Sequence, residues 1–584
     1  MDAPKSESKI GSQATGKKVT GSEALMLSLL QEGVTEIFGY PGGSIMPVYD
    51  VLMDYEKQIH HMLVRHEQGA VHAADGYARA SGKPGVVFAT SGPGATNLVT
   101  GISNANIDSV PIVCVTGQVN DLLLGTDGFQ EVDIIGVSAP VTKWNFQITR
   151  PEEIPEAVAK AFYIAKSGRP GPVLLDLTKN AQMGELEYDY EPCTHIRSYQ
   201  PNPDIDRQKI SEAVELINNA QKPLALIGHG VIIGQAEQAL KAFLDKTGMP
   251  AAATLLGLSA IPNNYPNYVG MLGMHGNYAP NILTNEADLL ISVGMRFDDR
   301  VTGKLSTYGK NARVIHMDID PAEIDKNVKA DVPIIGNAKD SIPLLTEKVH
   351  ARKFPEWIDQ FREHEKEEFR KILSKHQDES REHVRMIDVI LQLNQRKDDL
   401  LLVTDVGQHQ MIACRYFHFT RSRSSITSGG LGTMGFGLPA AIGAQIGVPE
   451  RQVIAVSGDG GFQMTLQELG TIAQYKIPLK MIILNNSYLG MVRQWQQLFF
   501  KKRYSSTPMT SPNYFKIAEG YGVSTQKVVE RKELPAAIDQ MFEHSGPYLL
   551  EVVVEKEDNV FPMIPPGASV SDIMLGAPEE ENNA

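Results

Sequence analysis

Short runs of aliphatic residues alternate along this sequence with longer segments of helical periodicity. The runs at 85–90, 111–116 and 173–177 are rich in Val, Ile and Leu and are almost wholly apolar. A strand that is apolar on both faces must be covered on both sides, which is typical of parallel sheets flanked by helices. The pattern therefore predicts the α/β class, with doubly wound parallel sheets.

The same pattern returns in two further parts of the chain. The additional strands are expected at 223–227, 289–293 and 314–317, and at 400–404, 453–456, 480–484 and 548–553. The three blocks are similar in size. They predict three doubly wound domains, which suits a chain of 584 residues at roughly 100–200 residues per domain.

Two polar segments separate these blocks. Residues 189–206 contain prolines and few apolar side chains, so they are predicted to be a linker. Residues 361–384 are strongly charged and are expected to form a solvated connecting helix. The predicted organisation is a flexible N-terminus (1–20), a first domain (21–188), a central domain (206–350), a charged helical linker (351–384), a third domain (385–555) and a C-terminal tail (556–584).

Composition excludes several classes of function. The chain has 55 basic and 69 acidic residues, a formal charge of −14, and no marked basic patch, which argues against nucleic-acid binding. No run of about 18 apolar residues could span a membrane. The polar N-terminus is not predicted to be a secretory signal, and the 3 cysteines are too far apart for a predicted metal site. These features suit a cytoplasmic protein in a reducing compartment.

Gly458, Asp459 and Gly460 follow directly after one of the predicted strands. Ligands of open α/β sheets bind at the carboxyl ends of the strands. The glycines would let the backbone approach a diphosphate closely, and Asp459 would supply a hard oxygen to a divalent metal. For an isolated motif, an ordinary strand-to-helix turn is the better interpretation.

Asn485 and Asn486 end the next predicted strand, after 24 intervening residues. Alone, an Asn pair indicates only a turn. Two oxygen-bearing motifs at successive strand ends are a more specific combination, because a magnesium ion could use both together with phosphate oxygens. This spacing resembles the signature of thiamine-diphosphate enzymes.

Glu67 lies in a segment, Arg65-His66-Glu67-x-x-Ala70, that resembles the catalytic glutamate motif of the same enzymes. Without that resemblance, a carboxylate on the surface at a helix start would be the plain interpretation. The resemblance implies that Glu67 hydrogen-bonds the aminopyrimidine ring of the cofactor and promotes formation of the ylid. Because Glu67 and Asp459 fall in different blocks, it also implies an active site between two chains, and hence a homodimer or homotetramer.

Longer phrases narrow the resemblance to one family. From about residue 21 to 566 the chain resembles acetohydroxyacid synthases, also called acetolactate synthases. The phrases that carry this match are at 38–43, 88–97, 271–276, 296–303, 426–435 and 489–495.

The resemblance assigns residues to thiamine diphosphate and magnesium. Met434 would wedge between the two rings of the cofactor, although a core methionine is the alternative. Asp459, Asn486 and the backbone carbonyl of Tyr488 would bind the metal. The expected cofactor contacts are Glu67, Gln408, His409, Gly432, Met434, Gly458, Asp459, Gly460, Gly461, Asn486, Tyr488, Gly490 and Met491.

The resemblance also implies that the central domain binds FAD. The turn Gly228-His229-Gly230 lacks a third glycine at Rossmann spacing, so it is a weak dinucleotide signal by itself. The expected FAD contacts are Arg169, Gly228, His229, Gly230, Thr254, Leu255, Leu272, Gly273, Met274, His275, Gly294, Arg296, Asp298, Arg300, Val301, Asp318, Ile319, Asn337 and Ala338.

The activity that the resemblance implies is carboligation. Pyruvate is decarboxylated on the cofactor, and the hydroxyethyl unit joins a second 2-ketoacid, pyruvate or 2-ketobutyrate. The products would be 2-acetolactate or 2-aceto-2-hydroxybutyrate, precursors of branched-chain amino acids. Trp495 would shape an apolar pocket that favours 2-ketobutyrate, although a core aromatic is the alternative. The expected substrate residues are Gly43, Phe129, Gln130, Lys179, Arg296, Met491 and Trp495.

Alternative functions remain at this point. A pyruvate oxidase-like enzyme would use the same two cofactors but release acetyl phosphate or acetate. Glyoxylate carboligase characteristically lacks the glutamate at the position of Glu67, and a catabolic acetolactate synthase would lack flavin. A degenerate binding scaffold would have lost Glu67, Asp459 or Asn486, and all three are present. The resemblance further implies a separate regulatory small subunit.

Overall fold

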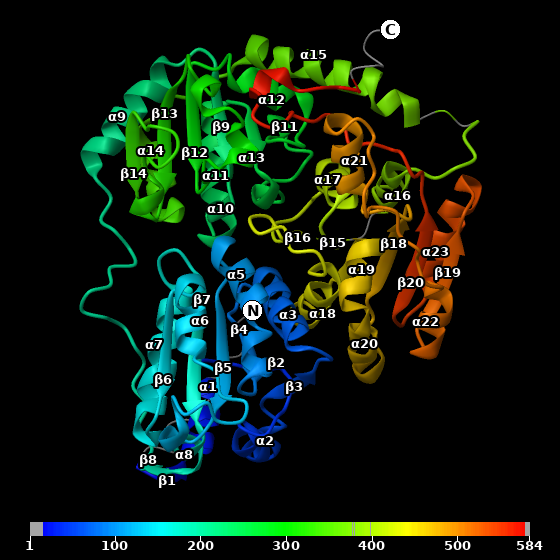
Figure 1. The fold of residues 1–584 in the computed structure, drawn as a ribbon. Coiled ribbons are helices and arrows are strands. Elements are labelled where there is room, and N and C mark those ends of the chain that lie inside the picture. Colours follow the sequence, from blue (N-terminus) through cyan, green and yellow to red (C-terminus); the bar gives the residue numbers. More distant parts are fainter. Residues whose placement is uncertain (1–15, 377, 379, 397–398, 578–584) are drawn as a thin grey trace, which may run out of the picture.

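The computed structural model describes residues 16–376, 378, 380–396 and 399–577. Most of the predicted flexible N-terminus and the last residues of the predicted tail lie outside this range. Figure 1 shows three α/β domains, with the central domain (green) above the first (blue to cyan) and the third (yellow to red) beside them. Each domain has a six-stranded parallel sheet between helices, which confirms the predicted fold class.

The first sheet has the order β3-β2-β4-β5-β7-β6. A short antiparallel pair, β1 with β8, closes the start of the chain against the end of this domain. The strands are β1 (Lys18–Thr20), β2 (Glu36–Gly39), β3 (His60–Leu63), β4 (Gly85–Ala89), β5 (Ile112–Gln118), β6 (Trp144–Ile148), β7 (Pro172–Thr178) and β8 (Glu185–Glu187). The helices are α1 (Gly21–Gln31), α2 (Met46–Leu52), α3 (Glu67–Ser81), α4 (Pro93–Thr96), α5 (Val99–Ile107), α6 (Ile134–Ser138), α7 (Ile154–Lys166) and α8 (Lys179–Met183).

The central sheet has the order β11-β10-β9-β12-β13-β14. Its strands are β9 (Pro223–Ile227), β10 (Ala251–Ala253), β11 (Tyr268–Met271), β12 (Leu289–Val293), β13 (Arg313–Asp318) and β14 (Val332–Ile335). The helices of this part are α9 (Arg207–Asn219), α10 (Gly230–Ile233), α11 (Glu237–Thr247), α12 (Tyr278–Thr284), α13 (Asp299–Thr302), α14 (Ala338–Lys348) and α15 (Pro355–Lys371).

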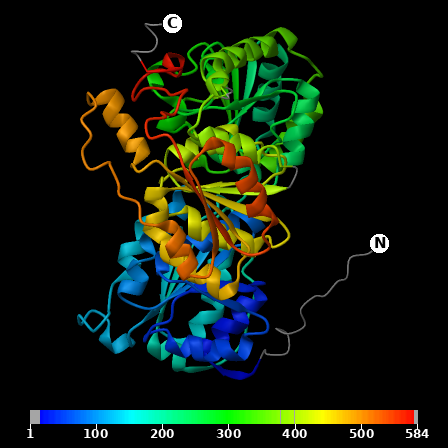
Figure 2. The same cartoon turned by 90° about the vertical axis from the view of Figure 1, so that its right-hand side faces the viewer.

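The third sheet has the order β16-β15-β17-β18-β20-β19. Its strands are β15 (Leu400–Thr404), β16 (Ser425–Thr427), β17 (Gln452–Gly458), β18 (Lys480–Asn485), β19 (Ser524–Val528) and β20 (Tyr548–Val553). Its helices are α16 (Met386–Leu393), α17 (Gln408–Tyr416), α18 (Gly437–Gly447), α19 (Asp459–Thr465), α20 (Leu469–Tyr475), α21 (Gly490–Phe499), α22 (Tyr514–Gly520) and α23 (Leu534–Glu543). Figure 2 shows α21 and the loop after it along one side of the molecule.

Helix α15 differs from the solvated connecting helix predicted for the charged segment. Trp357 and Phe361 are buried in the core of the central domain, and Trp357 Nε1 donates a hydrogen bond to Pro223 O (2.9 Å). Glu368 is also buried and accepts hydrogen bonds from Asn277 Nδ2 and from the Tyr278 backbone. Three widely spaced side chains therefore anchor this charged helix along one face.

No helix in the described part of the chain is long and apolar enough to cross a membrane.

Helices α3 and α18 join the first and third domains through glycine contacts. A Cβ atom at Gly76 would lie 1.9 Å from Ala440 O, and one at Gly443 would lie 1.7 Å from Ala73 O. Real Cβ atoms do not approach backbone oxygens this closely. The two helices can therefore pack at this distance only because neither position carries a side chain.

Substitution of Gly443 by Ala should destabilise the protein by about 1–3 kcal/mol or more, because the added methyl group must push the two helices apart. Thermal and urea unfolding of the purified protein would measure this. Gly520→Ala is the matched control, since Gly520 ends α22 with no atom near its Cβ position. That control should be neutral or stabilising by up to about 1 kcal/mol. Equal stability of G443A and the wild type would contradict the packing argument.

Candidate active site

The two oxygen-bearing motifs of the third domain meet at one edge of its sheet. Strand β17 ends at Gly458, and Asp459 is the first residue of α19. Strand β18 ends at Asn485 and pairs in parallel with β17, with Gly458 opposite Leu484. Asp459 and Asn486 therefore follow neighbouring strand ends, and both are buried. The parallel topology is what brings these distant residues together.

Burial raises the pKa of Asp459 to about 6, although Ser511 Oγ donates a hydrogen bond to Asp459 Oδ2 (3.0 Å). Asn486 Oδ1 accepts from the Tyr488 backbone (3.1 Å), and its amide group donates to Gln408 Oε1 (3.3 Å). Among the described residues, no group of three or more His, Cys, Asp or Glu side chains could hold a metal ion. A metal at Asp459 would therefore need oxygens from the bound cofactor as well.

Glycines let the segments around this cleft pack closely. A Cβ atom at Gly460 would lie 2.9 Å from Leu489 Cδ2, and one at Gly490 would lie 2.2 Å from Gln408 Oε1. The cleft brings together eleven of the residues predicted for thiamine diphosphate. They are Gln408, His409, Met434, Gly458, Asp459, Gly460, Gly461, Asn486, Tyr488, Gly490 and Met491.

His409 lies in this cleft in one definite protonation state. Burial lowers its pKa to about 4, so the ring is neutral near pH 7. Its Nε2 accepts a hydrogen bond from the Gly458 backbone (3.2 Å). The proton is therefore on Nδ1, and His409 holds the turn in front of Asp459 as an acceptor.

A larger cavity of about 1220 Å³ lies between the domains. All of the residues predicted for FAD line it: Arg169, Gly228, His229, Gly230, Thr254, Leu255, Leu272, Gly273, Met274, His275, Gly294, Arg296, Asp298, Arg300, Val301, Asp318, Ile319, Asn337 and Ala338. Gly432 and Trp495 line it too, whereas Met434 and Met491 line both this cavity and the thiamine cleft. The two spaces are therefore neighbours with a shared wall.

The large cavity is lined by an arginine that two carboxylates hold and by a partly buried aspartate. Arg169 Nη1 donates to Asp320 Oδ2 (3.1 Å) and to Glu323 Oε1 (2.8 Å), which fixes its guanidinium at the rim. Asp318 stands at the carboxyl end of β13, where burial raises its pKa to about 6. A carboxylate in this place can accept hydrogen bonds from ligand hydroxyl groups.

The glycines of the Gly228-His229-Gly230 turn have a packing explanation. A Cβ atom at Gly228 would lie 2.1 Å from Gly294 O, and one at Gly230 would lie 2.6 Å from Gly294 Cα. The turns after β9 and β12 thus touch through their backbones. This contact, and not a Rossmann fingerprint, requires glycine here.

The predicted residues of the first domain form a separate group. Gly43, Glu67, Gln130 and Lys179 follow β2, β3, β5 and β7, at the carboxyl edge of the first sheet. Glu67 Oε2 accepts a hydrogen bond from Asn97 Nδ2 (2.9 Å). Neither the thiamine cleft nor the large cavity is lined by these four residues or by Phe129, which is 89% exposed. Within one chain, the structure does not bring Glu67 to Asp459.

Several residues of the site had no role in the sequence-based prediction. Ser511 contacts Asp459, and no motif around it signals this. Other unpredicted residues that line the large cavity include Asp108, Gln410, Met411, Ser428, Gly429, Gly430 and Leu431. The Ser428-Gly429-Gly430 sequence lies inside the phrase at 426–435, so adjacent glycines in that phrase were an available signal.

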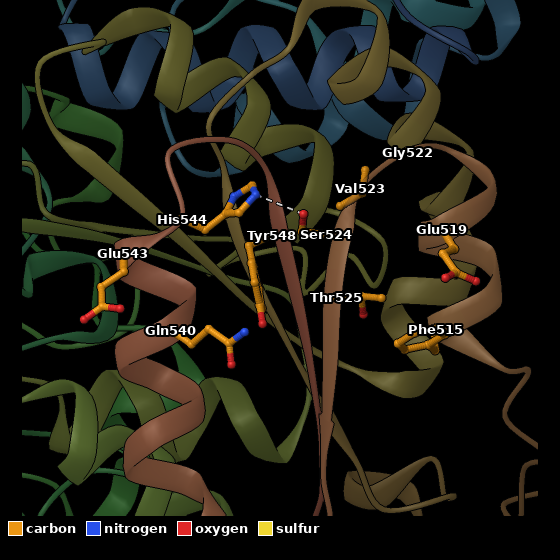
Figure 3. A pocket seen from close by; sticks show the side chains of 10 residues that line it. All are labelled: Phe515, Glu519, Gly522, Val523, Ser524, Thr525, Gln540, Glu543, His544 and Tyr548. Carbon is orange, nitrogen blue, oxygen red and sulfur yellow. Dashed lines mark hydrogen bonds between the residues drawn. The ribbon is translucent and has the colours of Figure 1, made fainter.

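A further pocket lies at the opposite end of the third sheet, where β19 and β20 begin (Figure 3). His544 Nδ1 accepts a hydrogen bond from the Gly546 backbone (3.1 Å), so its proton is on Nε2, which faces Ser524 Oγ at 2.9 Å. A histidine in this state cannot accept the proton of Ser524. The pair is therefore not an activated nucleophile, and the pocket is far from the strand ends that carry Asp459 and Asn486.

Comparisons with known proteins agree with this geometry. Family models for the thiamine pyrophosphate enzymes match residues 19–137 (N-terminal TPP binding domain), 210–345 (central domain) and 405–552 (C-terminal TPP binding domain). The chain is 46% identical over 558 residues to the acetolactate synthase isozyme 2 large subunit of Escherichia coli (strain K12), covering 95% of this chain and 99% of that protein. It is 44% identical over 570 residues to the acetolactate synthase large subunit of Porphyra purpurea, covering 96% of each.

The chain belongs to the acetolactate synthase large-subunit family. A probable acetolactate synthase large subunit of Methanocaldococcus jannaschii is also similar, at 43% identity over 568 residues and 95% of each chain. Membership confirms the family predicted from the sequence. The two TPP binding domains support thiamine diphosphate as the cofactor, and the first and third domains each carry one of them.

Alanine at Gly490 should weaken binding of thiamine diphosphate about tenfold or more, because its methyl group would meet Gln408 Oε1 at 2.2 Å and Asn486 Nδ2 at 2.7 Å. Gln408 cannot move aside freely, since its amide group donates to Gln494 Oε1 and Asp558 O. Calorimetric titration at fixed magnesium would measure the affinity, with Gly520→Ala as the control. Unchanged affinity in G490A would exclude this cleft as the diphosphate site.

Proposed function

We propose that this chain catalyses the acetohydroxyacid synthase reaction. It decarboxylates pyruvate on thiamine diphosphate and joins the two-carbon unit to a second 2-ketoacid, pyruvate or 2-ketobutyrate. The observation that carries the proposal is the placement of Asp459 and Asn486 on neighbouring strand ends of a glycine-lined cleft. Similar proteins named acetolactate synthase supply the reaction.

The cleft residues fit a diphosphate held through a magnesium ion. Asp459 and Asn486 would offer side-chain oxygens and Tyr488 its carbonyl, with phosphate oxygens and water as the other ligands. Thiamine diphosphate supplies an electron sink for the decarboxylation of 2-ketoacids. The raised pKa of the Asp459 carboxyl reflects the cost of burying its charge, and a bound cation would remove that cost.

Glu67 would hold and move the proton at the ring nitrogen of the cofactor. Asn97 occupies Glu67 Oε2, and a Cβ atom at Gly94 would lie 3.3 Å from Oε1. The absence of a side chain at Gly94 thus leaves room beside Oε1. That oxygen is the one available to a ligand.

A second copy of the chain would complete the site. Glu67, Gly43, Gln130 and Lys179 lie at the edge of the first sheet, apart from the thiamine cleft of the same chain. Phe129, 89% exposed, and Leu122, 86% exposed, stand on the loop after β5, where a partner chain would cover them. We therefore expect a homodimer or homotetramer in which each site is made by two chains.

The large cavity would hold FAD. Its size suits a ligand longer than a usual drug-sized molecule, for which pockets of about 300–1,000 Å³ are typical. Arg169 at the rim and Asp318 at the end of β13 offer a cation and an acceptor to a dinucleotide. A yellow purified protein would support this assignment. The large-subunit names of the relatives also indicate a separate small subunit as a partner.

Product analysis distinguishes this function from a pyruvate oxidase-like one. Purified protein with pyruvate, thiamine diphosphate and magnesium should form acetolactate. Acetyl phosphate or acetate as the main product would overturn the proposal.

Glu67→Gln should lower kcat by about 100-fold or more, because an amide cannot pass the proton to the cofactor ring. Folding and cofactor binding should be unchanged, since Gln keeps the acceptor for Asn97 Nδ2. Steady-state kinetics and calorimetry would test both points. Full activity of E67Q would show that Glu67 has no part in proton transfer.

Mixing E67Q with Asp459→Asn tests the proposed inter-chain site. Each homodimer lacks an essential group in both sites, but a mixed dimer has one site with both groups intact. After dissociation and reassociation at equal amounts, activity should return to roughly one quarter of the wild type, since half of the dimers are mixed. No recovery, with mixed dimers verified by mass spectrometry, would place Glu67 and Asp459 in one chain.

Trp495→Leu should reduce the preference for 2-ketobutyrate over pyruvate by about 10-fold or more, because the extra methylene of the acceptor would lose its apolar contact. Competition between the two acceptors in one assay measures the ratio. Phe499→Leu is a suitable control, since Phe499 packs against Trp495 at 5.5 Å between ring centroids but does not line the cavity. An unchanged ratio in W495L would remove Trp495 from the acceptor pocket.

A further inference from the structure

The loop after β16, residues 428–434, forms part of the wall between the two cofactor spaces. Ser428, Gly429 and Gly430 line the large cavity, and Met434 lines both this cavity and the thiamine cleft. Any shift of this 428–434 loop would alter both spaces at once. What holds the loop in place therefore matters for both cofactors.

Asp108, directly after α5 of the first domain, binds the start of this loop. Its Oδ1 accepts a hydrogen bond from the Gly430 backbone (2.7 Å), and its Oδ2 accepts one from the Gly429 backbone (3.0 Å). Arg79 Nη2 also donates to Oδ2 (2.9 Å). Asp108 is 2% exposed, so these bonds lie at a buried position in the wall of the large cavity.

Charged side chains surround the hydrogen bonds between Asp108 and the loop. Arg79 also pairs with Asp75, so one buried cation faces two buried carboxylates. The pKa of Arg79 is raised by both carboxylates, and the guanidinium stays charged. The other acceptor positions of the two carboxylates are taken by neutral donors, among them the two glycine amides and Asn104 Nδ2. Hydrogen bonds to a buried charge are stronger than neutral ones.

Asp108 also reaches the central domain. His229 lies in the turn after β9, and its Nδ1 is 3.2 Å from Asp108 O. Burial lowers the pKa of His229 to about 3, so the ring is neutral and donates this bond from Nδ1. One residue of the first domain thus touches the flavin-side turn of the central domain and the cofactor loop of the third.

Side chains are excluded from both loop glycines. A Cβ atom at Gly430 would lie 2.9 Å from Asp108 Oδ1, and one at Gly429 would lie 2.6 Å from Leu256 Cγ of the central domain. Farther along the loop, Ser428 Oγ donates to Asn104 Oδ1 and accepts from the Thr433 backbone (2.8 Å). The loop is thus enclosed by the first and central domains.

We propose that Asp108 is a positioning residue for the cofactor cavity, which sets the 428–434 loop against the flavin-side turn at the junction of the three domains. The flavin part of this inference rests on the proposed function. The carboxylate acts through the loop backbone, and the Asp108 backbone carbonyl contacts His229. Asp108 lines the large cavity but not the thiamine cleft.

Asp108→Asn tests the proposal with little change in shape. Arg79 keeps Asp75, but the Asn side chain has only one oxygen, so its amide nitrogen faces one of the loop amides as a second donor. Hydrogen–deuterium exchange of at least one of the Gly429 and Gly430 amides should become about tenfold faster or more in the cofactor-free protein. The FAD concentration at half-saturation, followed by flavin fluorescence, should rise about tenfold as well.

Asp176→Asn is the matched control. Asp176 is an equally buried carboxylate of the first domain, but its donors, Thr116, Gln118 and Gln147, all belong to its own sheet. It should lower stability without faster exchange at Gly429 and Gly430. If D108N is destabilised like D176N and leaves both exchange and FAD titration unchanged, Asp108 is only a structural residue and the proposal fails.

Ser428→Ala provides a second variant if D108N does not fold. It removes one hydroxyl group without unpairing a charge, and exchange of the Thr433 amide should become faster while Gly429 and Gly430 stay protected. Loss of protection at Gly429 and Gly430 in this variant would overturn the assignment of their protection to Asp108, because Asp108 is intact there. A wild-type protein that binds no FAD would refute the flavin assignment alone, because the exchange comparison does not depend on it.

Discussion

The close contact of α3 with α18 is the constraint on which the arrangement of the active site depends. Gly76 and Gly443 let the two helices touch through their backbones, so the first and third domains pack directly against each other. Glu67 is the first residue of α3, and Met434 comes shortly before α18. A hinge between these domains could not bring Glu67 to Asp459 of the same chain without breaking this contact. This packing therefore holds Glu67 apart from Asp459 within one chain.

The polar side chains of the candidate site lie at the carboxyl edges of three parallel sheets. Asp459 and Asn486 use the third sheet, Asp318 the central one and Glu67 the first. Parallel strands all end on the same side, so residues far apart in sequence become neighbours without long excursions of the chain. Backbone contacts between glycine turns, such as Gly228 with Gly294, then set how closely the neighbouring loops can approach.

The sequence predicted the buried strands much better than the others. Strands β9, β12, β15 and β20 begin and end where their apolar runs do. All six edge strands were missed, because strands such as β3 and β6 are short and partly exposed and so lack a continuous apolar run. The cofactor residues predicted by motif are those with a characteristic local sequence. Ser511 and Asp108 act through contacts with residues far away in the chain, which no local pattern records.

The exposed loop that carries Leu122 and Phe129 has a consequence for how activity depends on the amount of protein. If a working site needs two chains, the number of sites follows the law of mass action. Well below the dissociation constant of the dimer, the concentration of sites would grow with the square of the chain concentration. Dilution alone would then switch off the enzyme without unfolding it, and the two apolar side chains on this loop would help to set the concentration at which that happens.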